Sequence, residues 1–142
     1  MRTVIIDTGP LVAFLNRRDR HHIWAAEQFG ALAPPLLTCE AVLSEAAYLV
    51  RGLAGGPDAI LEFVARGVVK PTFRLQEEVS SVKALMRRYA RDLADACLVR
   101  MSEMHSDCVV LTIDSEFRDV YRRHGRQVIP TLLPPYAKRR RR

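Results

Sequence analysis

Two patterns of hydrophobic and polar positions alternate along the chain. Short apolar runs rich in β-branched residues occur at positions 3–6, 36–38, 68–69, 108–113 and 127–129. Between them lie longer stretches in which apolar residues recur with helical spacing, at 10–16, 22–32, 41–53, 58–66, 75–90, 93–105 and 116–124. Strands that alternate with helices are typical of a parallel sheet with helices on both faces. The pattern therefore predicts a single three-layer α/β domain.

Length and composition agree with one globular domain. The chain has 142 residues, of which 49% are hydrophobic and 27% charged, too apolar for a disordered protein. The three cysteines, Cys39, Cys97 and Cys108, are odd in number and form no Cys-x-x-Cys pair, which argues against a disulfide framework or a thiolate zinc site. No apolar run approaches the roughly 20 residues of a membrane helix, and the first run is too short for a signal peptide. We therefore expect a cytoplasmic protein without membrane association.

Charge is concentrated at the C-terminal end. The net charge is +6, and the last five residues, 138–142, are all lysine or arginine. The rest of the chain is therefore close to neutral. We expect residues 1–135 to form the folded domain and residues 136–142 to be a disordered basic tail. Such a tail is either a solvated appendage or a tether for nucleic acid.

Two aspartates follow apolar runs in a way that indicates a site. In open parallel sheets, ligands bind beyond the carboxyl ends of the strands. Asp7 directly follows the first run and Asp114 follows the fourth, although each could equally cap a helix. Thr112 lies two residues before Asp114 and so shares its strand face, and Glu116 adds a third polar group nearby. The sequence thus predicts a polar cluster at one edge of the sheet.

Two further acids lie on predicted helices. Glu45 interrupts an apolar stripe, where a buried carboxylate costs several kcal/mol unless it is paired, protonated or bound to a cation. A buried ion pair is the alternative interpretation. Asp95 lies in the first turn of a helix, where the helix dipole already favours an acid, and Asp92 is the better candidate for its cap. Spacing alone is therefore weak evidence that Asp95 belongs to a functional site.

The acids have a common chemical implication if they converge. Carboxylates brought close together repel each other and raise one another's pKa values. A divalent cation removes this cost, and a ligand set made only of oxygen selects Mg²⁺, or Mn²⁺, over zinc. We therefore expect a magnesium-type site.

Five segments of the chain match a known family in the family's order. They are Ile-Ile-Asp-Thr-Gly-Pro-Leu-Val-Ala-Phe-Leu at 5–15, Asp-Arg-His-His at 19–22, Ala-Val-Leu-Ser-Glu-Ala at 41–46, Leu-Ala-Asp-Ala-Cys-Leu-Val at 93–99 and Leu-Thr-Ile-Asp-Ser-Glu-Phe at 111–117. On these segments the chain resembles the PIN-domain ribonucleases, and within them the VapC toxins of bacterial and archaeal toxin–antitoxin pairs. The resemblance extends from residue 4 to about residue 130.

The resemblance implies a fold and a set of site residues. The fold is a three-layer α/β/α sandwich with a five-stranded parallel sheet in the order 3-2-1-4-5. The implied catalytic acids are Asp7, Glu45, Asp95 and Asp114, with Thr112 and Glu116 in support, and the implied metal ligands are Asp7, Asp95 and Asp114. Many relatives have aspartate at the position of Glu116. The family's histidine corresponds to His22, for which we favour a structural role.

The resemblance also implies an activity and partners. The chain would be a Mg²⁺-dependent endoribonuclease, with Mn²⁺ as an alternative metal, that leaves a 5′-phosphate and a 3′-hydroxyl on RNA. It would act as the toxin of a toxin–antitoxin pair, form a homodimer and bind a small antitoxin. Candidate RNA-binding residues, for which a solvated helix face is the alternative, are Arg17, Arg18, Arg20, Arg87, Arg88, Arg139 and Arg140.

Other functions compete with this interpretation. A phosphotransferase of the haloacid-dehalogenase type needs a second aspartate two residues after the first, where this chain has Gly9. A receiver domain needs adjacent acids near the first strand, which are absent from the sequence. The remaining alternative is a non-catalytic PIN scaffold that binds RNA or a protein partner.

Overall fold

A parallel sheet of five strands forms the centre of the molecule. The computed structural model describes residues 2–89, 92–135 and 137. The sheet has the order β3-β2-β1-β4-β7, and all neighbouring strands are parallel. Its strands are β1 (Thr3–Ile6), β2 (Leu36–Thr38), β3 (Val69–Pro71), β4 (Cys108–Leu111) and β7 (Thr131–Leu132). The predicted α/β architecture and strand order are confirmed.

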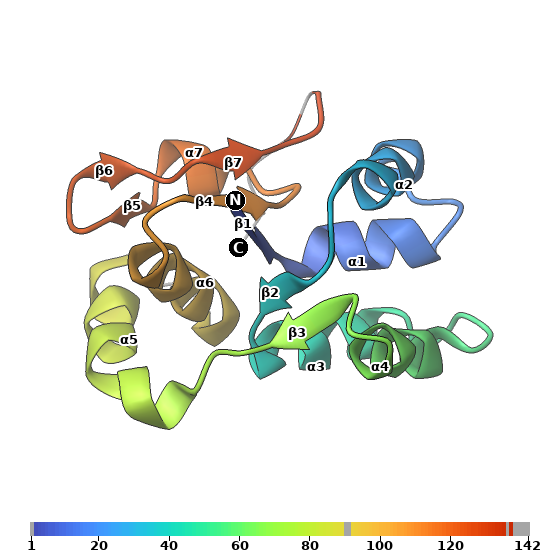
Figure 1. Ribbon diagram of the computed structural model, residues 1–142, viewed down its shortest axis with the longest axis horizontal. Helices are drawn as coiled ribbons and strands as arrows, with labels where there is room; N and C mark the ends of the chain where they lie inside the picture. Colours follow the sequence, from blue (N-terminus) through green and yellow to red (C-terminus); the bar gives the residue numbers. More distant parts are fainter. Residues whose placement is uncertain (1, 90–91, 136, 138–142) are drawn as a thin grey trace.

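Helices cover both sides of the sheet (Figure 1). On one side are α1 (Thr8–Leu15), α2 (His22–Ala31), α3 (Glu40–Leu49) and α4 (Gly56–Ala65), and on the other are α5 (Leu75–Tyr89) and α6 (Leu93–Met104). The short helix α7 (Glu116–Asp119) follows β4. Right-handed crossovers explain this distribution, because the chain moves outward from β1 to β3 and then returns to β4 on the opposite side of β1.

The segment after β4 differs from the sequence-based prediction. The predicted helix 116–124 ends at Asp119, and a small antiparallel hairpin of β5 (Arg122–Arg123) and β6 (Gln127–Val128) follows. The turn contains His124 with φ 52° and Gly125 with φ 82°, left-handed conformations that end any helix. The predicted strand 127–129 therefore starts in this hairpin, and the fifth strand of the main sheet is β7, a few residues later.

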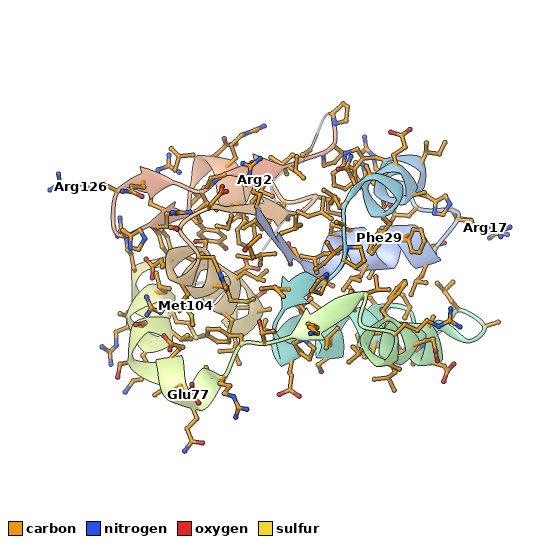
Figure 2. All side chains as sticks on the ribbon, in the orientation of Figure 1. Arg2, Arg17, Phe29, Glu77, Met104 and Arg126 are labelled. Atoms are coloured by element: carbon orange, nitrogen blue, oxygen red, sulfur yellow. The ribbon has the colours of Figure 1, made fainter. Side chains whose placement is uncertain are left out.

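The core is continuous from the sheet into the helices. Every residue of β4 is buried, as are Val4, Ile5 and Ile6 of β1, which agrees with strands that are covered on both faces. On the side of α1–α4, the Phe29 ring stacks on Phe14 at 4.5 Å and on Phe63 at 5.7 Å between centroids (Figure 2). The stacking of these rings packs α2 against α1 and α4.

The cysteines and the helices bear on two expectations from the sequence, that the chain has no disulfide framework and no membrane helix. Cys39, Cys97 and Cys108 are free thiols, and all three are buried. Across the described residues, the helices are too short or too polar to span a bilayer.

Candidate active site

The carboxyl ends of β1 and β4 lie side by side and carry two of the candidate acids. Ile6 pairs with Leu111, and the Asp7 N–H donates to the Leu111 carbonyl at 3.0 Å. Between β1 and β4 the chain also reverses the direction in which strands are added, which is where open α/β sheets bind ligands. The topology therefore brings Asp7 and Asp114 to the expected edge.

Asp7 is held by two donors. It is the N-cap of α1, and its Oδ1 accepts a hydrogen bond from the Thr8 N–H at 2.7 Å. Its Oδ2 accepts from the Thr112 hydroxyl at 2.7 Å, across 105 positions in the sequence. The capping role and the site position predicted for Asp7 are thus compatible, and its carboxylate has a fixed orientation.

Thr112 connects Asp7 to Asp114. The Thr112 Oγ1 that donates to Asp7 also accepts from the Asp114 N–H at 3.0 Å, and Asp114 Oδ1 accepts from the Glu116 N–H at 3.0 Å. All four residues are buried. The predicted supporting residues therefore lie in one chain of hydrogen bonds that runs from Asp7 to Glu116.

Asp95 is buried at the start of α6, where it is hydrogen-bonded to Asp92 and Tyr121. As expected, Asp92 is the N-cap of this helix, and its Oδ1 accepts from the Asp95 N–H at 2.9 Å. The Asp95 Oδ2 accepts a hydrogen bond from the Tyr121 hydroxyl at 2.5 Å. Burial raises the pKa of Tyr121 well above its usual range, and the hydrogen bond to Asp95 and the charges of Asp95, Glu116 and Asp114 raise it further. The charges of Asp95, Asp114 and Glu116 therefore all raise the pKa of the Tyr121 phenol.

Glu45 faces a pocket together with the two strand-end acids. This pocket has a volume of about 430 Å³ and is lined by Asp7, Thr8, Gly9, Val12, Asp19, Arg20, His21, Glu45, Leu49, Ile113 and Asp114. Glu45 is half-buried on α3, and within the described part of the chain its carboxylate makes no hydrogen bond or ion pair. Among the residues that the structure describes, Glu45 therefore does not form the buried ion pair considered as its alternative.

The four predicted acids are not all in this pocket. Asp95 is absent from its lining. In residues 2–89, 92–135 and 137, no group of three or more His, Cys, Asp or Glu side chains comes close enough to hold a metal ion. The donor set itself fits a hard divalent cation, because Asp7, Glu45 and Asp114 offer only carboxylate oxygens to one pocket.

Some pocket residues were not predicted from the sequence. Thr8 is buried, and its hydroxyl has no hydrogen-bond partner among the described residues. Asp19 holds the loop before α2 by accepting at its Oδ1 from the His21 N–H at 2.8 Å. Burial lowers the pKa of His21, opposed by Asp19 and reinforced by Arg20. The match of 19–22 to the family was the available signal for this loop.

His22 makes a contact between two helices, which agrees with a structural role. Its Nδ1 lies 2.8 Å from the Ala13 carbonyl oxygen, a contact between the first turn of α2 and α1. It does not line the pocket.

The candidate RNA-binding arginines occupy different positions. Arg20 lines the pocket and makes no ion pair within the described residues. Arg17 and Arg18 are exposed, and Figure 2 shows Arg17 pointing away from the body. Arg87 and Arg88 are exposed at the end of α5, where Arg88 Nη2 donates to the Gly125 carbonyl at 2.8 Å. Arg139 and Arg140, with most of the predicted tail, lie outside the described residues.

The backbone of Gly9 lies very close to the side chain of Ile113, and both residues line the pocket. A Cβ atom at Gly9 would collide with the Ile113 side chain. Gly9 therefore allows the first turn of α1 to approach the loop that carries Asp114.

Comparisons with known proteins bear on the fold and the family of the chain. A search of curated proteins found no match. Among solved structures, the chain is similar to Mycobacterium tuberculosis VapC20, described as a sarcin–ricin loop cleaving toxin, with 20% sequence identity and a TM-score of 0.65. The similarity covers 76% of this chain and 87% of that chain. The model of the PIN domain family matches residues 4–123, a range that holds all four candidate acids. The chain therefore belongs to the PIN domain family.

Proposed function

We propose that this PIN-domain chain is a Mg²⁺-dependent endoribonuclease, with Mn²⁺ as an alternative metal. The catalytic residues would be Asp7, Glu45, Asp95 and Asp114, supported by Thr112 and Glu116. The observation that carries the proposal is the hydrogen-bonded chain from Asp7 through Thr112 to Asp114 at the switch point of the sheet. A phosphodiester bound at this edge would meet carboxylates that are already oriented.

Asp7, Asp95 and Asp114 are the residues that would hold the metal. A bound Mg²⁺ would supply Lewis acidity, lowering the pKa of a water and neutralising charge on the phosphate. The protein's own part is to orient these acids. The Thr8 N–H and the Thr112 hydroxyl fix Asp7, and the Glu116 N–H fixes Asp114. Glu45, which lines the same pocket, can accept a hydrogen bond from the attacking water at its carboxylate.

Product ends test the reaction. We expect the purified chain to cleave RNA in Mg²⁺ and to leave 5′-phosphates that a ligase can join, because hydrolysis by water does not use the 2′-hydroxyl. Asp114→Asn should lower the rate by about 100-fold or more, since it removes a charged ligand. The measurement is gel analysis of end-labelled RNA with enzymatic typing of the ends.

Three outcomes would contradict the proposal. Cyclic or 3′-phosphate ends, or equal cleavage by Asp114→Asn, would indicate a contaminating nuclease. RNA binding without any cleavage would identify a non-catalytic scaffold instead.

Arg20 is the residue that we expect to contact the RNA backbone beside the acids. Among the described residues, it is the only lysine or arginine that lines the pocket, where four acids would repel a phosphate. A guanidinium with no ion pair can bind a phosphate through two hydrogen bonds. We expect Arg20→Ala to weaken RNA binding and to lower the slope of log K against log salt by about 0.7 to 1.

The exposed Arg17 gives a matched comparison for Arg20. It belongs to the same loop but lies outside the pocket lining. Arg17→Ala should therefore cause a smaller loss when both variants are titrated by fluorescence anisotropy in EDTA, which prevents cleavage. Equal losses for the two variants would contradict a specific role of Arg20.

We further propose that the chain is the toxin of a toxin–antitoxin pair. The proposed biological unit is a cytoplasmic homodimer that binds a small antitoxin, with residues 1–135 as the nuclease domain and 136–142 as a basic appendage. The similarity in fold to VapC20 supports this role. Expression of the wild-type chain in a bacterium should arrest growth, whereas Asp114→Asn should not. Arrest by both variants would separate toxicity from cleavage and contradict the proposal.

A further inference from the structure

A buried tyrosine is hydrogen-bonded to one of the candidate metal ligands. Tyr121 follows α7 and is only 1% exposed, and its hydroxyl donates to Asp95 Oδ2 at 2.5 Å. Hydrogen bonds from a hydroxyl to a carboxylate are short and about twice as strong as those between neutral groups. The two residues are 26 positions apart and lie on different elements, so this contact depends on tertiary packing.

The position of the Tyr121 hydroxyl is set by the packing of its ring. The ring makes edge contacts with Tyr89, at 5.1 Å between centroids, and with Phe117, at 4.9 Å. These arrangements are favourable for aromatic pairs and restrict rotation of the ring. The Tyr121 N–H also donates to the Glu116 carbonyl at 2.9 Å. The donor that meets Asp95 is therefore rigid.

Tyr121 also links Asp95 to the strand-end acids. Asp114, Glu116 and Tyr121 belong to one short segment after β4, whereas Asp95 comes from α6. Within this segment, Glu116 contacts Asp114 through its N–H and Tyr121 through its carbonyl. Tyr121 in turn contacts Asp95. A continuous set of contacts thus connects Asp95, which lies outside the main pocket lining, to Asp114, which is part of it.

We infer that Tyr121 is a positioning residue, which holds the Asp95 carboxylate in the orientation needed for divalent-metal binding alongside Asp114. This inference rests on the proposed function. Tyr121 acts only through Asp95, because its hydroxyl is directed to that carboxylate. Partners of this kind fix the rotamer of a ligand before the metal arrives, and their loss commonly lowers metal affinity by about 10-fold to 100-fold.

Metal affinity tests the role of Tyr121 without relying on cleavage. Mn²⁺ binding to the metal-free full-length chain is measured by titration calorimetry. Tyr121→Phe removes the hydroxyl and keeps the ring, and it should weaken Mn²⁺ binding by about 10-fold to 100-fold. The matched control is Tyr89→Phe. The Tyr89 ring packs on Tyr121, but its hydroxyl accepts from the Arg122 N–H instead of contacting an acid. This control should bind Mn²⁺ as the wild type does.

A double-mutant cycle separates positioning from a loss of stability. If Tyr121 acts through Asp95, Tyr121→Phe should have no further effect on Mn²⁺ binding in an Asp95→Asn background. A second readout uses the wild-type tyrosine directly. Mg²⁺ should produce a tyrosine difference band in the near-ultraviolet absorption spectrum, and Tyr89→Phe, which keeps the hydrogen bond between Tyr121 and Asp95, should retain this band. The second readout holds even if Tyr121→Phe folds poorly.

The outcomes are distinguishable. Equal Mn²⁺ affinity of wild type and folded Tyr121→Phe would overturn the inference and leave the proposed nuclease intact. The same loss in the wild-type and Asp95→Asn backgrounds would also overturn it, because the effect would not pass through Asp95. A wild-type chain that binds no Mn²⁺ would overturn the proposed metal-dependent function, and the inference with it.

Discussion

Asp7→Asn is expected to abolish RNA cleavage while leaving the protein folded. Asparagine can still accept the Thr8 N–H, and it is as good an N-cap as aspartate, so α1 should keep its start. The variant loses the negative charge proposed to bind the metal. A loss of several kcal/mol of transition-state stabilisation corresponds to about 100-fold to 1,000-fold in rate. Single-turnover cleavage of labelled RNA measures the rate, and thermal unfolding checks the fold.

Asp19→Asn is the matched control for Asp7→Asn. Asp19 also lines the pocket, and asparagine can still accept the His21 N–H that organises its loop. Both variants remove one negative charge from the same pocket, but only Asp7 is hydrogen-bonded to Thr112 at the strand ends. We expect Asp19→Asn to retain most of the cleavage rate. Equal inactivation of the two variants would mean that pocket charge matters more than the identity of the acid.

Removal of divalent metal is expected to stop cleavage and to lower stability. Asp7 and Asp114 are buried and line one pocket with Glu45, so the mutual repulsion of these carboxylates is relieved when a cation binds. Mg²⁺ at 100 times its dissociation constant should raise the free energy of unfolding by about 2.7 kcal/mol. The measurements are cleavage in EDTA, recovery on adding Mg²⁺ or Mn²⁺, and thermal unfolding with and without metal.

The stabilisation must depend on the proposed ligands. The same Mg²⁺ titration of Asp7→Asn should give a much smaller increase in unfolding free energy. Undiminished cleavage in EDTA, or equal stabilisation of both proteins, would contradict binding of the metal at these acids.

Hydrophobic periodicity predicted the architecture well, for physical reasons. Strands β1 and β4 are buried on both faces and therefore appear in the sequence as continuous apolar runs. The segment after Asp119 was predicted poorly. Its apolar residues have helical spacing, but the left-handed turn at His124 and Gly125 does not allow a helix there. The chain then folds back on itself as a hairpin. Local backbone chemistry, rather than hydrophobicity, decides the structure there.

The site was predictable to different degrees. Asp7 and Asp114 follow their strands directly, so the parallel topology alone brings them together. Glu45 was marked by its place in an apolar stripe, and the structure gives it a half-buried position in the pocket. The contact of Tyr121 with Asp95 could not be predicted from the sequence, because this hydrogen bond arises from the packing of α6 against the segment after β4. Contacts between elements distant in the sequence cannot be derived from local pattern.

The burial of all three thiols makes the chain simple to label. Because Cys39, Cys97 and Cys108 are inaccessible, a cysteine introduced on the surface would be the preferred target of a maleimide dye. Arg126 is exposed at the hairpin and lies at the opposite end of the molecule from Arg17, which follows α1 near the acidic pocket (Figure 2). A fluorophore attached through Arg126→Cys would therefore report rotational diffusion or surface immobilisation from the end of the molecule opposite Arg17.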